Sequence, residues 1–97
     1  MRKKLKGLKK VEGKDKGEVV VITNSTDQQS DMLKNFLKEQ NVSFSYIDVD
    51  LASSEDKETI TQSIEAYTPQ QAYPVVVVNS EKVVIGFDEN KLMEIFA

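Results

Sequence analysis

The spacing of apolar residues changes several times along this chain, and each change predicts a new element of secondary structure. The continuous β-branched run at 19–22 predicts a strand that is buried on both faces. Apolar side chains then recur at helical spacing from about residue 28 to 40, which predicts an amphipathic helix. Phe44 and Tyr46 alternate with smaller neighbours, which predicts a second strand over 43–48.

The second half of the chain continues with helix, strand, strand and helix. Serines at 53–54 provide an N-cap for a helix that ends at Thr68–Pro69. The apolar run at 74–78 predicts a central strand, and a polar turn at 79–81 leads into an antiparallel strand over 82–85. Asp88 is a natural N-cap for a short final helix. The predicted order is therefore β-α-β-α-β-β-α, an α/β domain.

Charge divides the chain at about residue 17. Residues 1–16 contain eight of the 13 basic residues and two acids, a net charge of +6, whereas the remainder carries −9. We therefore expect a basic, flexible N-terminal arm at 1–17 and a single folded domain at 18–97. The arm contains no aromatic side chain for base stacking, and the acidic domain repels polyanions, so nucleic acid is an unlikely partner.

The chain has 97 residues, with no cysteine and no histidine. This composition excludes disulfides, zinc–cysteine sites and iron–sulfur clusters, and it removes the usual general base. No apolar stretch approaches the roughly 20 residues that span a bilayer. The lysine-rich start lacks the apolar segment of a secretory signal, so we expect a cytoplasmic protein without a membrane segment.

Three segments together resemble the glutaredoxin family. Residues 21–37 resemble its first strand, active-site loop and first helix, and residues 41–50 resemble its second strand. Residues 72–79, followed by 85–88, resemble its cis-proline segment, hairpin and entry to the last helix. The resemblance implies a thioredoxin-like fold of the glutaredoxin subtype, with a four-stranded mixed sheet and three helices. Where the family has Cys-x-x-Cys, this chain has Asp27-Gln28-Gln29-Ser30.

The resemblance also implies a ligand-binding surface at three places in the chain. Its candidate residues are Asp27, Gln28, Gln29, Ser30, Ala72, Tyr73, Pro74, Gly86, Phe87 and Asp88. In the family, the residue before the cis-proline pairs its backbone with an extended peptide or glutathione, and the aspartate at position 88 helps to bind the ligand's amino group. The residues themselves leave simpler roles open: Asp27 and Asp88 as N-caps, and Pro74 as the start of a strand.

These observations lead to three functional hypotheses. The first is a non-catalytic module that binds a protein or peptide partner at the cis-proline groove. The second is a glutaredoxin-type oxidoreductase whose cysteines were substituted. The third, an enzyme with Asp27 as nucleophile or base, lacks a second titratable group or metal beside it.

We expect no resident cofactor or metal, and a monomer. Glutathione is a disfavoured ligand, because Asn24 is neutral where many relatives have lysine. Asp27 also places a negative charge where the tripeptide's thiol would lie.

Overall fold

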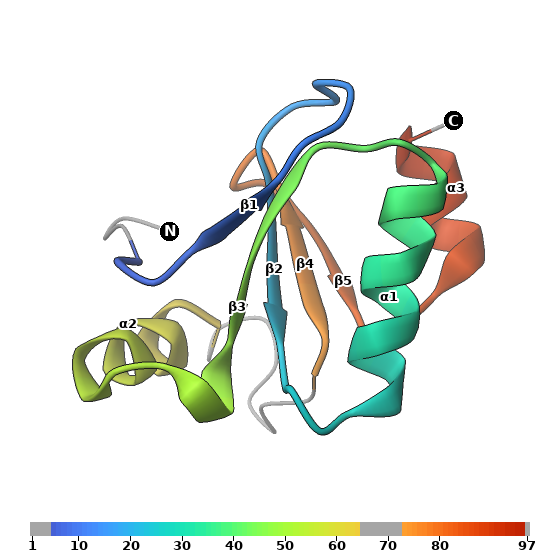
Figure 1. The fold of residues 1–97 in the computed structure, drawn as a ribbon. Helices are drawn as coiled ribbons and strands as arrows, with labels where there is room; N and C mark the ends of the chain where they lie inside the picture. Colours follow the sequence, from blue (N-terminus) through green and yellow to red (C-terminus); the bar gives the residue numbers. More distant parts are fainter. Residues whose placement is uncertain (1–4, 65–72, 97) are drawn as a thin grey trace.

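The computed structural model describes residues 5–64 and 73–96, which form a mixed sheet in the order β1-β3-β2-β4-β5 (Figure 1). The strands are β1 (Lys9–Val11), β2 (Val19–Thr23), β3 (Phe44–Asp48), β4 (Val75–Val78) and β5 (Lys82–Ile85). The helices are α1 (Gln28–Glu39), α2 (Ser54–Ile64) and α3 (Glu89–Phe96), with a short 3-10 helix, η1 (Val49–Leu51). β2 and β3 run parallel, and the other three pairs of neighbours are antiparallel.

The predicted order of elements is confirmed, and the fold is thioredoxin-like. α1 and α3 cover one face of the sheet, and α2 packs on the other (Figure 1). β2 contributes Val19 and Val21 to the core under α1 and α3, and Ile22 to the core under α2. This explains its uninterrupted β-branched sequence, because a strand covered on both faces has no solvent-facing position. The predicted end of the second helix at 68–69 lies outside the described residues.

The sheet has five strands, so the predicted count of four is one short. The additional strand, β1, comes from residues 1–17, which we expected to be a flexible basic arm, and pairs antiparallel with β3. Leu5 is buried and Val11 packs against the core, while Lys9 and Lys10 between them are exposed. Composition suggested a solvated tail because lysine dominates the segment. The hydrogen bonds of an edge strand, however, come from the backbone and leave such side chains in water.

A buried carboxylate also fastens the N-terminal segment to α2. Asp56 is only 3% exposed, and its two oxygens accept the backbone N–H groups of Lys6 at 3.0 Å and Gly7 at 2.9 Å. The neighbouring Glu55 forms an ion pair with Lys6 at 3.0 Å, but both of these side chains are largely exposed. The buried hydrogen bonds are expected to contribute more to stability than the exposed ion pair.

Replacing Asp56 with alanine should therefore destabilise the fold by about 1–3 kcal/mol, because it leaves two backbone donors without their acceptor. The matched control, Glu55→Ala on the same helical turn, should cost less than about 1 kcal/mol. Urea denaturation measures both values, and amide exchange at Lys6 and Gly7 should accelerate more in the Asp56 variant. Equal losses in the two variants would contradict this role of Asp56.

Candidate ligand-binding site

The three segments predicted to form the site meet at one end of the sheet, where β2 ends and β4 begins (Figure 1). Ile22 is the sheet partner of Val75, so the loop after β2 lies next to Pro74. The N–H of Gly86 donates to the carbonyl of Pro74 at 2.7 Å, which joins the turn after β5 to the same place. The antiparallel pairing of β2 with β4, and of β4 with β5, thus brings the three segments together.

Asp27 is the N-cap of α1, and it is bonded to Ser30. Its Oδ2 accepts the Ser30 N–H at 3.2 Å and the Ser30 hydroxyl at 3.0 Å. The Ser30 oxygen in turn accepts the N–H of Asn24 at 3.1 Å, and the N–H of Asp27 donates to the Asn24 carbonyl at 3.1 Å. Ser30 is fully buried. The two residues at the cysteine positions are therefore members of one closed ring of hydrogen bonds.

Gln29 connects the start of α1 to the turn before α3. Its Oε1 accepts the N–H of Phe87 at 3.4 Å, whereas Gln28 is exposed on the preceding position. Phe87 packs edge-on against Phe36 of α1, with 5.8 Å between ring centroids. Gly86 has a φ of 78°, a left-handed conformation that favours glycine. These contacts join the start of α1 to the turn before α3.

Tyr73 and Pro74 precede β4, and the peptide bond between them is cis. Tyr73 is half-buried against the core under α2, and this burial raises the pKa of its phenol. Its backbone forms no hydrogen bond with another residue in the described ranges 5–64 and 73–96. Asp88 accepts the N–H of Lys91 at 3.1 Å and so caps α3. The remaining predicted site residue, Ala72, lies outside the described residues.

Sequence reasoning missed a polar network beneath the loop after β2. Asp48 Oδ1 accepts the hydroxyl of Thr23 at 2.6 Å and forms an ion pair with Lys34 at 3.0 Å. The Lys34 and Asp48 side chains are only 15% and 12% exposed, and the Lys34 amine lies 4.2 Å from the centroid of the Tyr46 ring. The acidic end of the predicted strand at 43–48 was the available signal, because β2 and β3 are parallel and end together.

A second carboxylate, Asp50 in η1, fixes the site loop itself. It accepts both the hydroxyl and the backbone N–H of Ser25, the latter at 2.9 Å. The hydrogen bond from the Ser25 hydroxyl, followed by that from the Ser25 N–H, lowers the pKa of the Asp50 carboxyl below its ordinary value of 3.8. Asp50 was not among the predicted site residues, since only the tertiary structure places η1 beside Ser25.

The described residues of this site are joined by hydrogen bonds. Among the described residues, no three acidic, histidine or cysteine side chains are grouped to bind a metal ion. None of the described helices is long and apolar enough to cross a membrane. Asp27 Oδ2 accepts two hydrogen bonds from Ser30, and the Ser30 oxygen accepts the N–H of Asn24. Asp27 Oδ1 accepts no hydrogen bond from the described residues.

The sheet order, the helix N-terminus beside Pro74 and the final hairpin define a thioredoxin-fold protein. The sequence profile of the family named Glutaredoxin matches residues 19–83, and the chain belongs to the glutaredoxin family. A comparison with curated protein sequences gives no match.

Solved structures give the same classification. The glutaredoxin of Methanosarcina mazei Go1 is 27% identical with a TM-score of 0.87, covering 93% of this chain and 87% of its own. The methanoredoxin of Methanosarcina acetivorans is 29% identical with a TM-score of 0.83, covering 88% of this chain and 90% of its own. The glutaredoxin of Archaeoglobus fulgidus is 29% identical with a TM-score of 0.73, covering 81% and 85%.

The Ser25–Asp50 contact makes a prediction about pH. Because the folded-state pKa of Asp50 is depressed, its contribution to stability is present above pH 3.8 and is lost as the pH falls through the folded pKa. Ser25→Ala should shift the Asp50 pKa back toward 3.8, measured by NMR titration of the carboxyl carbon. Thr26→Ala is the control, because the Thr26 hydroxyl donates to Asn24 instead. A Ser25→Ala variant with an unchanged Asp50 pKa would refute the contact.

Proposed function

We propose that this protein is a non-catalytic member of the glutaredoxin family that binds an extended segment of a protein or peptide partner. The binding surface consists of the start of α1, Tyr73–Pro74 and the turn at 86–88. The observation that carries the proposal is the presence of Asp27 and Ser30 at both thiol positions, where Asp27 Oδ2 accepts the N–H and the hydroxyl of Ser30. Thiol–disulfide exchange requires a thiolate nucleophile, and this chain contains no sulfur of that kind.

The helix N-terminus explains why the fold tolerates this replacement. Unpaired N–H groups and the helix dipole stabilise an anion at the first turn, whether the anion is a thiolate or a carboxylate. In this chain the Asp27 carboxylate accepts the Ser30 N–H at 3.2 Å. The electrostatic feature that promotes redox chemistry in a thiol protein therefore serves as a helix cap here. Such caps contribute about 1 kcal/mol to stability.

The backbone of Tyr73 supports binding of an extended partner. Among the described residues it has no hydrogen-bond partner, while the next residue, Pro74, uses its carbonyl to accept the N–H of Gly86. An extended segment beside Tyr73 could therefore add main-chain hydrogen bonds as an extra strand does, a mode that depends on the backbone and needs no cysteine.

The acidic character of the site disfavours glutathione as that ligand. Asp27 and Asp88 both line the proposed surface, and the residue at position 24 is a neutral asparagine. An anionic tripeptide would bring like charges together at the edge of a helix N-terminus, at a cost of about 1 kcal/mol for each close pair in water. A neutral or basic segment avoids this repulsion.

The second candidate function is a thiol oxidoreductase whose cysteines were substituted. Family membership and the preserved position of α1 beside Pro74 favour it. Under this proposal the rest of the site keeps the geometry that thiol chemistry requires. Restoring both sulfurs therefore separates the two candidates.

The protein as it stands should reduce neither a mixed glutathione disulfide nor insulin above the buffer rate. The Asp27→Cys/Ser30→Cys variant should gain glutathione-dependent reductase activity if only the sulfurs are missing, because a thiol at this helix N-terminus has a lowered pKa. A variant without activity favours the binding module. Activity in the unaltered protein would contradict both the absence of thiol chemistry and the proposed function.

Selection from a random displayed peptide library tests binding directly. Enriched peptides should cause saturable NMR shifts at residues 24–30, 73–74 and 86–88. Gln29→Trp should weaken peptide binding at least about tenfold by crowding the surface. Gln62→Trp is the matched control, because Gln62 is an exposed glutamine on α2. Peptides that bind both variants equally, or shift residues elsewhere, would refute this surface.

A further inference from the structure

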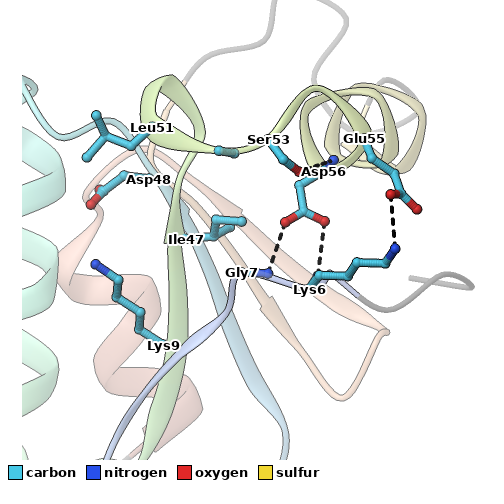
Figure 2. Close-up of a pocket in the computed structure, with 10 residues that line it drawn as sticks. Lys6, Gly7, Lys9, Ile47, Asp48, Leu51, Ser53, Glu55 and Asp56 are labelled. Atoms are coloured by element: carbon cyan, nitrogen blue, oxygen red, sulfur yellow. Dashed lines mark hydrogen bonds and ion pairs between the residues drawn. The ribbon is translucent and has the colours of Figure 1, made fainter.

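A pocket separate from the site described above lies between the N-terminal segment and the start of α2. Its volume is about 450 Å³, within the range of small-molecule sites. Figure 2 shows Lys6 and Gly7 on one side, the η1–α2 turn on the other, and Ile47 of β3 between them. The wall built by residues 6–9 exists because the N-terminal segment pairs with β3 and is fastened by Asp56.

Most charged groups that line this pocket are already committed to partners. Both Asp56 oxygens accept backbone N–H groups, and Glu55 is paired with Lys6. Asp48 uses only Oδ1, which accepts from Thr23 and Lys34. These groups shape the pocket, and their hydrogen bonds do not need to break for a ligand to enter.

One cation and one carboxylate oxygen in the pocket are not bonded to any residue of the described ranges. Lys9 forms no ion pair with any residue of the described ranges, and Asp48 Oδ2 accepts no hydrogen bond from them. Figure 2 shows the Lys9 side chain extending toward the Asp48 carboxylate, and no ion pair joins the two. Since a carboxylate can accept several hydrogen bonds, Oδ2 remains available to a ligand's ammonium group.

Apolar surface lies beside these two charges. Leu51 is 71% exposed, and Ala52 and Ile47 continue the apolar lining. A ligand that fits this lining carries both charges close together on a short apolar body.

We propose that this pocket binds a small zwitterion of the amino-acid type with an apolar side chain. Its carboxylate pairs with the Lys9 amine, its ammonium donates to Asp48 Oδ2, and its side chain covers Leu51 and Ala52. The Asp48 carboxylate is held by Thr23 and Lys34, which limits the ordering cost of binding at that group.

Isotope-labelled protein titrated with L-leucine tests the proposal by NMR. Saturable shifts should occur at residues 6–9 and 47–56, with a Kd on the order of 1 mM for a ligand of this size. Isocaproate lacks the ammonium group and isoamylamine lacks the carboxylate, so each should bind about fivefold more weakly. Absence of saturation with leucine, or equal binding of isocaproate, would overturn the assignment to a zwitterion.

A pair of adjacent lysines provides the variant test. Lys9→Gln should weaken leucine binding about fivefold, because it removes the carboxylate's partner. Lys10→Gln is the matched control: Lys10 is the next residue of β1, is exposed, and does not line the pocket. Its Kd should equal that of the unaltered protein. Equal weakening in the two variants would show that leucine responds to overall charge, and the pocket assignment would be wrong.

Discussion

The pairing of β2 with a neighbour on each side is the constraint on which the rest of this structure depends. Because β2 is parallel to β3 and antiparallel to β4, its C-terminal end lies beside the end of β3 and the start of β4. The loop before α1, the carboxylates of Asp48 and Asp50, and the Tyr73–Pro74 segment therefore lie close together at this end of the sheet. Apolar side chains on both faces of β2 join the two cores, with Val19 and Val21 under α1 and α3 and Ile22 under α2.

At this position the fold provides an environment for an anion, and the residue present decides the chemistry. The helix N-terminus favours negative charge, which in a thiol protein promotes a nucleophilic thiolate. Here the same environment contains a carboxylate inside a ring of hydrogen bonds formed by Asn24, Asp27 and Ser30. The fold of the glutaredoxin family and its redox chemistry are thus separable, because the first depends on the sheet and the second on sulfur.

The N-terminal segment is ordered in the structure, although its composition predicted a flexible arm. Eight basic residues in sixteen suggested a solvated arm, yet Leu5 is buried and β1 completes the edge of the sheet. Lys9 and Lys10 remain exposed to water while the backbone of β1 pairs with β3. The segment thereby becomes one wall of a pocket, so a feature expected to be outside the domain contributes to its surface chemistry.

The sequence by itself determined the order of elements from β2 onward, the burial of β2 on both faces, the N-caps at Asp27 and Asp88, and the absence of cysteine thiols. These are local properties: hydrophobic spacing, capping residues and the identity of side chains. Only the tertiary structure decided which residues the three carboxylates contact. Asp50 accepts hydrogen bonds from Ser25, and Asp48 binds both Thr23 and Lys34. Asp56 accepts the backbone N–H groups of Lys6 and Gly7. These partners are 14 to 50 residues apart in the chain. Their contacts arise from strand register and helix placement, which no local pattern of residues encodes.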